Sequence, residues 1–322
     1  MSSPAAARRS AGGPRRLLVL MGPTALGKTA VAVAVAARLS AEIVVADSMQ
    51  VYAGLPILTN QPSPEQMRNA PHHLVGYVDP RTEYSVAAYC EAAHAVIDRL
   101  RAAGRPVVIE GGSGLYVRAA LGDLSFGVPS DPSLRTRLEL RCEAEGLATL
   151  VAELETRDPG CAARIDTANP RRVVRALEIA ILQESPLSEG QYGRLWQAPD
   201  RYPHLLVALE DDRELIRDRI DSRVLEMIDA GAVDEVRRLE ALGTPSRTVA
   251  QAIGVRELRD HLAGRCSLEG AVATMQSRTR RLVRRQLTWM RKLPDAARLG
   301  VSGRPPDDVA DEVVALLERS KR

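Results

Sequence analysis

Short apolar runs alternate with longer stretches of helical periodicity in the first part of the chain. The runs at residues 17–21, 42–46 and 105–110 are rich in Val, Leu and Ile, which is typical of buried strands. An Ala- and Val-rich stretch up to Leu39 and a second stretch at 85–103 carry helical patterns between these strands. Strands and helices that alternate in this way predict an α/β fold, in which helices flank both faces of a parallel sheet.

The pattern changes near residue 129, where the strand signal stops and helical patterns dominate. Helices are expected at 131–146, 147–157 and 169–183. A strand is expected again at 202–209, and long amphipathic helices follow at 213–242 and 268–292. We therefore predict a disordered basic tail at 1–15, an α/β core at 16–128 and 200–300, a helical insertion at 129–199, and a C-terminal helix or tail at 301–322.

The composition is that of an ordinary globular protein. Of 322 residues, 45% are hydrophobic and 26% are charged, and no apolar run approaches the length of about 18 residues that a membrane helix needs. The net charge of +3 indicates no particular partner. Aromatic residues make up only 3%, so any bound nucleic acid is expected to be held mainly by charge and hydrogen bonds. The four cysteines form no C-x-x-C pair, which favours reduced thiols, a cytoplasmic location and no zinc site.

The first predicted strand leads into a phosphate-binding loop. Residues 22–29 read G-P-T-A-L-G-K-T, which matches G-x-x-x-x-G-K-T in full and lies between a strand and a helix, as the motif requires. The glycines let backbone N–H groups point at a phosphate, Lys28 adds a full positive charge, and Thr29 is suited to hold Mg²⁺. The candidate phosphate-binding residues are Gly22, Thr24, Ala25, Leu26, Gly27, Lys28 and Thr29. The motif leaves open whether the phosphate belongs to ATP, GTP or another diphosphate.

Polar residues also end the second and third predicted strands. Asp47 follows the second strand and Gly111-Gly112-Ser113-Gly114 ends the third, and the carboxyl ends of parallel strands form the edge where ligands bind. Asp47 is therefore expected to face the phosphate loop, although a turn or a helix cap also explains an Asp there. An ordinary strand-to-helix turn is the alternative for the glycines. Glu110 is the only acid of the third strand, which lacks the Asp-Glu arrangement of ATP-hydrolysing motors and so disfavours a motor.

The last long helix is expected to carry a strip of cations. Between residues 278 and 292 there is no acid, and apolar residues recur near helical spacing, so the cations lie on the other faces. The strip consists of Arg278, Arg280, Arg281, Arg284, Arg285, Arg291 and Lys292. We interpret it as a nucleic-acid contact, with a merely solvated face as the alternative. His72 and His73 have no acid or Cys at ligand spacing and are interpreted as a hydrogen-bonded loop pair, not as a metal site.

Several ordered motifs make the chain similar to the tRNA dimethylallyltransferase family (tRNA isopentenyltransferases), in its bacterial form. The resemblance covers residues 17–292 and includes the phosphate loop, D-S-M-Q-V-Y from Asp47, H-H-L from His72 and G-G-S-G-L-Y from Gly111. It also includes D-P-x-L-R from Asp131, R-R-V-V-R-A-L-E from Arg171, Q-A-I-G-V-R-E-L from Gln251 and T-R-R-L-V-R-R-Q-L-T-W-M-R from Thr279. The order of so many motifs makes chance implausible.

The resemblance implies transfer of a dimethylallyl group from dimethylallyl diphosphate to N6 of adenine 37, in the anticodon loop of tRNA, with release of diphosphate. It implies that the phosphate loop and Arg223 hold the prenyl diphosphate, with Mg²⁺ bound through Thr29. It implies Asp47 as general base and Ser113 as the hydroxyl that orients the amine or a phosphate oxygen, with Lys28, Thr29 and Arg135 as further catalytic residues. The implied tRNA contacts are Asp47, Ser48, Met49, Gln50, Ser113, Arg135, Arg171, Arg172, Arg175, Gln251, Gly254, Arg256, Arg280, Arg284, Arg285, Gln286, Trp289 and Arg291. A cytoplasmic monomer is expected.

The chain departs from the family pattern at a few positions. Ser113 stands where the family usually has Thr, and Leu26 replaces the commoner Ser. Ala53 and Val255 put individual tRNA contacts in doubt, but no residue that the chemistry needs is missing. The alternatives are the related adenylate isopentenyltransferase, which acts on a free nucleotide, a small-molecule kinase with a phosphate loop, and a non-catalytic RNA-binding protein.

Overall fold

The protein divides into two compact units in this computed structural model. One unit comprises Met1–Leu121 and Arg201–Arg322, and the other comprises Gly122–Asp200. The structure describes residues 17–124, 130–183, 199–293 and 295–320. The predicted basic tail at 1–15 lies outside these residues, and the predicted insertion at 129–199 falls within the second unit.

The first unit is built on a six-stranded parallel sheet, as the alternation of strands and helices predicts. The strand order is β3-β2-β4-β1-β5-β6. Four strands lie where the sequence predicts them: β1 (Leu17–Met21), β2 (Glu42–Val45), β4 (Val107–Gly111) and β5 (His204–Glu210). The edge strands β3 (His72–His73) and β6 (Ala297–Gly300) have no counterpart in the sequence prediction. Since β1 lies between β4 and β5, the loop after β1 is central at the carboxyl edge of the sheet.

The histidine pair is not in a loop, as we had expected, but forms strand β3. Backbone pairing with β2 places Ile43 opposite His72. The expected hydrogen bonds are present: His72 Nδ1 lies 2.8 Å from the Ala70 carbonyl oxygen, and His73 Nε2 lies 2.7 Å from Glu42 Oε2. A strand of two residues is too short to show a periodic pattern, so β3 cannot be predicted from periodicity.

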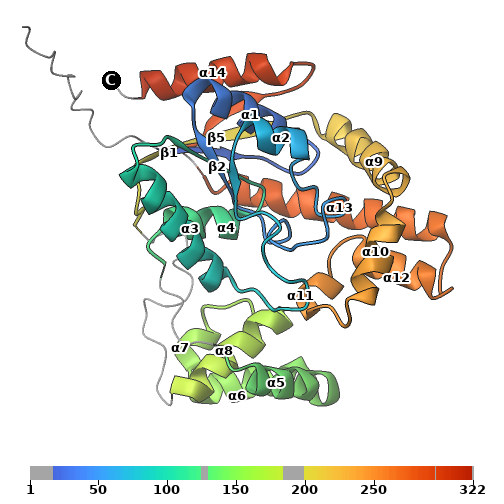
Figure 1. Cartoon of the computed structure of the whole chain (residues 1–322). Coiled ribbons are helices and arrows are strands. Elements are labelled where there is room, and N and C mark those ends of the chain that lie inside the picture. The colour runs from blue at the N-terminus through green and yellow to red at the C-terminus, as the bar shows by residue number, and fades with distance from the viewer. Residues whose placement is uncertain (1–16, 125–129, 184–198, 294, 321–322) are drawn as a thin grey trace, which may run out of the picture. The chain divides into compact units, whose positions relative to one another are not determined.

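Helices cover both faces of this sheet (Figure 1). On one face, α1 (Lys28–Leu39) and α14 (Pro306–Arg319) pack on each other and on the core side chains Leu18 and Leu20 of β1. On the other face lie α3 (Val86–Ala102) and α4 (Gly114–Leu121). The long helix α13 (Leu268–Met290) ends beside β1, where Met290 packs on Met21. These contacts fix both ends of the phosphate loop, because β1 precedes it and α1 follows it.

The predicted single helix at 213–242 is wrong, because the chain breaks there into α9 (Arg213–Asp229) and α10 (Ala232–Ala241). Gly231 has a φ of +94°, in the left-handed region that ends helices and favours glycine. The shorter helices α2 (Pro64–Asn69), α11 (Arg247–Ala250) and α12 (Val255–Leu262) complete the unit. Across all the described residues, none of the helices combines the length and the apolar character that a membrane crossing requires.

The second unit is a small helical bundle with a core of its own. Its helices are α5 (Pro132–Glu145), α6 (Leu147–Arg157), α7 (Pro159–Ala162) and α8 (Pro170–Gln183), and all but α7 correspond to helices that the sequence predicts. Leu138 of α5, Leu150 and Leu154 of α6, and Leu177 of α8 are buried against one another. Gly146, with φ +88°, separates α5 from α6 and lets the chain reverse there.

Candidate active site

The phosphate loop depends on two glycines with different tasks. A Cβ on Gly22 would lie only 3.1 Å from the Leu209 carbonyl oxygen, so a side chain there would require the loop or β5 to shift by a few tenths of an ångström. Gly27 has φ +71° and caps α1 in a left-handed conformation, which glycine adopts without strain. Ala25 also has a positive φ, +69°, which costs an L-residue about 1–2 kcal/mol. The Leu26 side chain is buried in the core, so only its backbone is available to a ligand.

Four charged side chains from separate elements interact at the end of this loop. Lys28, the first residue of α1, donates from Nζ to the Pro23 carbonyl oxygen at 2.9 Å. Burial lowers the pKa of Lys28, the carboxylates of Glu110 and Asp47 act in the opposite direction, and the Arg223 cation lowers it further. The structure therefore brings together Lys28, Asp47 and Arg223, which the sequence assigned to one site, and adds Glu110.

Asp47 lies after β2 with one carboxylate oxygen held and the other available. Oδ1 accepts hydrogen bonds from the backbone N–H of Met49 at 2.8 Å and of Gln50 at 3.4 Å. Oδ2 makes no hydrogen bond within the described part of the chain. Burial raises the pKa of Asp47, while the two N–H donors and Lys28 oppose that rise. A fixed carboxylate with a free oxygen and a raised pKa is suited to accept a proton.

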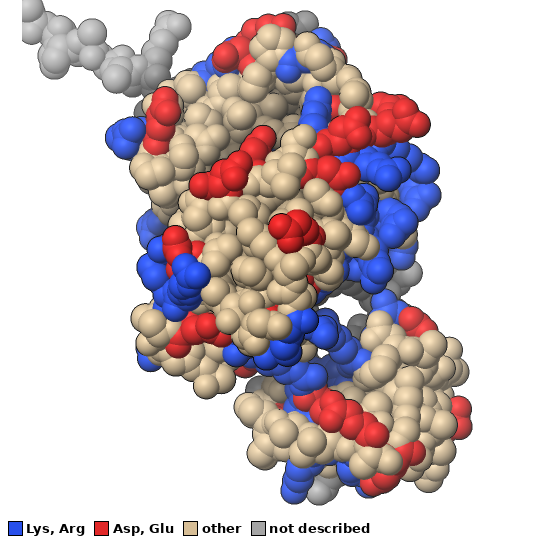
Figure 2. Space-filling view, turned by 90° about the vertical axis from the view of Figure 1, so that its right-hand side faces the viewer, with Lys and Arg blue, Asp and Glu red and all other residues tan. Residues whose placement is uncertain are grey.

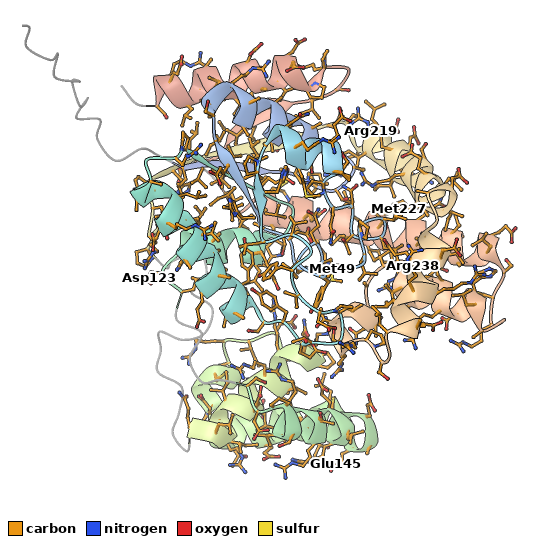
Figure 3. The ribbon with its side chains drawn as sticks, viewed as in Figure 1. Met49, Asp123, Glu145, Arg219, Met227 and Arg238 are labelled. Atoms are coloured by element: carbon orange, nitrogen blue, oxygen red, sulfur yellow. The ribbon has the colours of Figure 1, made fainter. Side chains whose placement is uncertain are left out.

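The turn after Asp47 holds the neighbouring predicted tRNA contacts Ser48, Met49 and Gln50. Met49 is labelled in Figure 3 and, like Ser48, is partly exposed. Gln50 is buried, and its side-chain Oε1 has no hydrogen-bond partner among the described residues. The backbone of this turn, anchored on Asp47 Oδ1, therefore sets the position of the carboxylate.

Glu110 is a site residue that the sequence interpretation missed. Its Oε1 accepts a hydrogen bond from the Thr29 hydroxyl at 2.9 Å, the side chain is 2% exposed, and Oε2 has no partner in the described residues. Burial raises its pKa, and Lys28 and the Thr29 hydroxyl oppose that rise. An acid near the end of an otherwise apolar buried strand was the available signal, and we had used it only to exclude a motor.

The glycines after β4 admit side chains from α13. A Cβ on Gly112 would lie 2.4 Å from Gln286 Nε2, and one on Gly114 would lie 2.8 Å from the Trp289 ring. Gln286 is 7% exposed, and its Oε1 accepts a hydrogen bond from the Thr24 backbone N–H at 3.0 Å. Ser113, between these glycines, is partly exposed at the start of α4. Gln286 and Trp289, predicted as tRNA contacts, thus lie against the carboxyl edge of the sheet.

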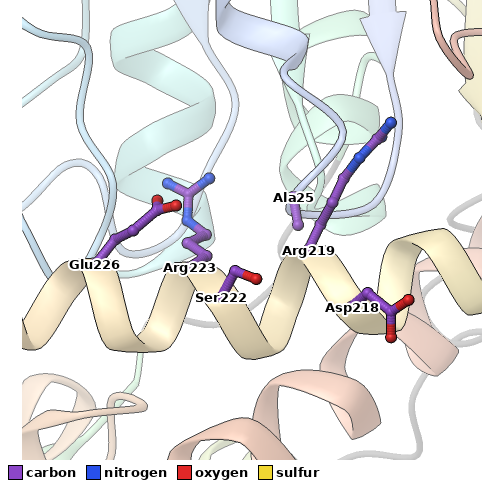
Figure 4. Close-up of a pocket in the computed structure, with 6 residues that line it drawn as sticks. All are labelled: Ala25, Asp218, Arg219, Ser222, Arg223 and Glu226. Atoms are coloured by element: carbon purple, nitrogen blue, oxygen red, sulfur yellow. The ribbon is translucent and has the colours of Figure 1, made fainter.

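Arg223 lines a pocket beside the phosphate loop. The pocket has a volume of about 320 Å³ and is lined by Ala25, Asp218, Arg219, Ser222, Arg223 and Glu226. Figure 4 shows Arg219 and Arg223 projecting from α9 toward the side of Ala25, with Asp218 turned away. Burial lowers the pKa of Arg223, and its Nε has no hydrogen-bond partner among the described residues. A partly buried cation beside a phosphate loop, with a donor that has no partner among the described residues, fits a ligand with anionic oxygens.

The predicted cation strip on α13 divides into paired and unpaired arginines. Arg278 pairs with Glu257 and donates to the Gln251 carbonyl oxygen, and Arg280 pairs with Asp221. Within the described residues, no acid pairs with the exposed cations Arg281, Arg284 and Arg285. Figure 2 shows that on one face of the molecule Lys and Arg side chains gather in patches, which Asp and Glu side chains interrupt. The available positive charge on α13 is therefore smaller than the count of cations predicts.

The other predicted tRNA contacts of the first unit differ in exposure. Arg256, on α12, is exposed, and so is Arg291 at the end of α13, which donates to the Thr288 hydroxyl at 2.9 Å. Gly254 is buried with φ +96°, and a Cβ there would lie 2.4 Å from Leu58 Cδ2. Its role in this structure is to let α12 start close to Leu58.

The second unit holds the remaining predicted residues, four arginines. Glu178, which is fully buried, pairs with Arg135 and, at 2.8 Å, with Arg175. It also accepts hydrogen bonds from the Ser130 hydroxyl at 2.7 Å and the Asp131 backbone N–H at 2.9 Å. The other two, Arg171 and Arg172, are exposed at the start of α8. Glu178 thus holds two of the four guanidinium groups in place.

Known proteins resemble this chain over most of its length. A family model described as IPP transferase matches residues 50–293. A tRNA dimethylallyltransferase from Symbiobacterium thermophilum is 41% identical over 306 residues, which cover 95% of this chain and 95% of that protein. One from Phenylobacterium zucineum is 43% identical over 278 residues, covering 86% and 89%.

Two solved structures are also similar to this chain. The crystal structure of a tRNA isopentenylpyrophosphate transferase from Bacillus halodurans has 34% sequence identity and a TM-score of 0.70, and covers 95% of this chain and 98% of that one. A eukaryotic dimethylallyltransferase, at 22% identity and a TM-score of 0.74, shares the fold. The extent of these matches shows that the chain belongs to the IPP transferase family.

Proposed function

We propose that this chain transfers the dimethylallyl group of dimethylallyl diphosphate to N6 of adenine 37 in tRNA. The observation that carries the proposal is the meeting of a phosphate loop with a carboxylate: Lys28 and Asp47 interact across the carboxyl edge of the sheet. The phosphate loop with Lys28 suits an anionic leaving group, and the Asp47 carboxylate is suited to accept a proton. The relatives named tRNA dimethylallyltransferase, at about 40% identity, support this reaction.

The donor's diphosphate is proposed to lie on the phosphate loop. Backbone N–H groups at the start of α1, the Lys28 ammonium and the Arg223 guanidinium supply positive charge where the leaving oxygens gain negative charge. Charge that is already in place when the C–O bond breaks stabilises the transition state more than the ground state. The same arrangement accounts for the partly buried Arg223, whose Nε has no hydrogen-bond partner in the described part of the chain.

Asp47 is proposed to act as the general base. N6 of adenine attacks C1 of the dimethylallyl group, the bond from C1 to the diphosphate oxygen breaks, and Asp47 Oδ2 accepts the N6 proton. Oδ1 stays bound to two backbone N–H groups, so the carboxylate keeps its orientation during transfer. Ser113 is proposed to orient the amine or a phosphate oxygen from the neighbouring strand end. The target base must leave its stack to reach this edge of the sheet.

Mg²⁺ is proposed as the metal of this site. Thr29 would hold it through the hydroxyl oxygen, and Glu110 would hold one of its waters, since Mg²⁺ prefers oxygen ligands and keeps several waters when it binds substrate phosphates. The buried Oε2 of Glu110, which has no partner in the described residues, fits such a cation. When bound, Mg²⁺ would neutralise part of the diphosphate charge.

The tRNA is proposed to be held through the anticodon loop by the exposed arginines, with those of the second unit included. Because the chain has few aromatic residues, this contact depends on charge. We propose a monomer as the working unit. We propose a cytoplasmic location, because four cysteines that form no C-x-x-C pair favour reduced thiols.

The test is transfer of labelled dimethylallyl from its diphosphate, with Mg²⁺, to unmodified tRNA that carries adenine or guanine at position 37. We expect label in the adenine tRNA alone. Label in free AMP but not in tRNA would overturn the acceptor in favour of an adenylate isopentenyltransferase. Phosphate transfer from ATP to a small molecule, without prenyl transfer, would overturn the reaction class.

A further inference from the structure

Glu110 occupies a position that the folding of the sheet does not explain. It lies in β4 opposite Leu20 of β1, between apolar neighbours, and its side chain is 2% exposed. A buried carboxylate costs free energy unless it is paired and fully hydrogen-bonded. Oε1 has one donor, the Thr29 hydroxyl at 2.9 Å, and Oε2 has no partner among the described residues. An apolar residue would serve the core better, so the carboxylate calls for a functional explanation.

The charges around Glu110 leave the site without an excess of positive charge. Lys28 interacts with two acids, Glu110 and Asp47, and with one further cation, Arg223. Two cations therefore face two carboxylates, and the carboxylates offset much of the attraction for a diphosphate, which carries several negative charges. A divalent cation restores that attraction, and a carboxylate beside the loop threonine is placed to recruit it.

We propose that Glu110 is a positioning residue that makes diphosphate binding at the phosphate loop depend on Mg²⁺. Oε1 of Glu110 accepts the hydrogen bond from the Thr29 hydroxyl. Because the Thr29 hydroxyl then acts as the donor, the lone pairs of its oxygen remain available to the cation. Oε2 is left to accept a hydrogen bond from a water that the cation carries. Outer partners of this kind orient metal ligands and raise their affinity for the metal. The inference rests on the proposed use of a diphosphate donor.

The experiment measures binding of inorganic pyrophosphate to the full chain by calorimetry, without tRNA, over a series of Mg²⁺ concentrations and in EDTA. The variant is Glu110→Gln, which keeps the size of the side chain and an oxygen for Thr29 but removes the charge. We expect the Mg²⁺ concentration for half-maximal pyrophosphate binding to rise about 10–100-fold. In EDTA we expect the variant to bind pyrophosphate at least as well as the wild type, because a nearby negative charge has been removed.

The control is Glu42→Gln, at the opposite, amino-terminal edge of the same sheet, where Glu42 pairs with His73. It removes the same charge from the same sheet and should leave the Mg²⁺ requirement unchanged. Thr29→Ala provides a second route should Glu110→Gln fail to fold. Since Glu110 acts through Thr29, this variant should raise the Mg²⁺ requirement as well, and adding Glu110→Gln to it should have less effect than in the wild type.

Three results would overturn the proposal. The first is a wild-type chain that binds pyrophosphate equally with and without Mg²⁺. The second is a Glu110→Gln variant with the wild-type Mg²⁺ requirement. The third is an equal loss of pyrophosphate binding by that variant with Mg²⁺ and in EDTA, which indicates a merely structural role. Failure of the proposed function is separate: it would appear as Mg²⁺-dependent pyrophosphate binding with the expected Glu110 effect but no dimethylallyl transfer to tRNA.

Discussion

The side-chain oxygen of Gln286 accepts a hydrogen bond from the backbone N–H of Thr24 at 3.0 Å, although the two residues are 262 positions apart. Gln286 belongs to α13, the helix that carries Arg284 and Arg285, and Thr24 belongs to the phosphate loop. The bond ties the helix that we propose for tRNA to the loop that we propose for the prenyl donor. It gives Gln286 a role in holding the loop that its motif alone does not reveal.

Gln286→Ala is expected to weaken binding of inorganic pyrophosphate about tenfold, which corresponds to about 1.4 kcal/mol. The variant leaves the Thr24 N–H without its hydrogen-bond partner and releases the phosphate loop from α13. Loss of the partner of a partly buried N–H group has a free-energy cost of this order. Calorimetric titration with pyrophosphate and Mg²⁺ measures the effect. The matched control is Gln276→Ala, because Gln276 lies on the same helix and bonds to the Asp221 carbonyl oxygen, away from the loop.

A second substitution tests the same contact from the other side. Gly112→Ala would place a Cβ 2.4 Å from Gln286 Nε2, so Gln286 must move, whereas a Cβ on Gly300 meets nothing within 4 Å. Gly112→Ala should therefore weaken pyrophosphate binding and Gly300→Ala should not. Unchanged pyrophosphate binding in Gln286→Ala, together with weaker tRNA binding, would show that Gln286 acts as an RNA contact and not as a support of the loop.

Asp47→Asn is expected to lower the rate of transfer by about two to four orders of magnitude, the range that a general base contributes. Binding of tRNA should change little, because Asn keeps an oxygen for the Met49 and Gln50 N–H groups, and binding of pyrophosphate should not weaken, because a negative charge near Lys28 is removed. Single-turnover rates and filter binding separate the two effects. A variant with the wild-type rate would remove Asp47 from the chemistry.

The pH dependence of Asp47 follows from its burial, which raises its pKa in the folded protein. The proton-accepting form is therefore lost, as pH falls, at a higher pH than the value of about 3.9 for an ordinary Asp. The acidic limb of kcat/KM should lie above that value. For stability the sign is opposite to that of an ion-paired acid: ionisation of Asp47 disfavours the folded state at neutral pH. Asp47→Asn should consequently melt at the wild-type temperature or higher at pH 7.

The double variant Arg284→Ala/Arg285→Ala is expected to weaken tRNA binding and to reduce the slope of log Kd against log salt by about one to two units. Both arginines are exposed, and no acid in the described part of the chain pairs with either. The control is Arg237→Ala/Arg259→Ala, which changes the net charge equally but removes arginines paired with Asp234 and Glu240. An equal change of slope in both double variants would mean that net charge, and not the α13 surface, determines tRNA affinity.

Local sequence patterns predicted the helices and strands that have strong periodicity, but they did not predict contacts between distant segments of the chain. The strands β1, β2, β4 and β5 were predicted because each is a run of buried apolar residues next to turn residues. The break at Gly231 was missed because the apolar spacing of α9 continues into α10. Glu110 and Gln286 could be found as polar residues, but their contacts with Thr29 and Thr24 depend on how distant segments meet, which no local pattern specifies.

Glu178→Gln is expected to destabilise the second unit by about 2–4 kcal/mol, because Glu178 is fully buried and binds Arg135 and Arg175. Burial opposes ionisation, but hydrogen bonds from Arg175, Ser130 and Arg135 outweigh it and hold the pKa of Glu178 below its usual value. An acid with a lowered pKa stabilises the fold above the unfolded pKa of about 4.3, and this stabilisation is lost as pH falls through the folded pKa.

Hydrogen exchange of the α5 and α8 amides in the full chain, at neutral and acidic pH, measures both effects. In Glu178→Gln the protection should be lower at neutral pH and should depend less on pH. Glu145→Gln is the control, because Glu145 is exposed and the variant removes only its surface pair with Arg141. It should change the free energy of opening that hydrogen exchange measures by less than about 0.5 kcal/mol. Equal protection in wild type and Glu178→Gln would mean that other contacts hold the Arg135 and Arg175 guanidinium groups and that Glu178 does not stabilise the second unit.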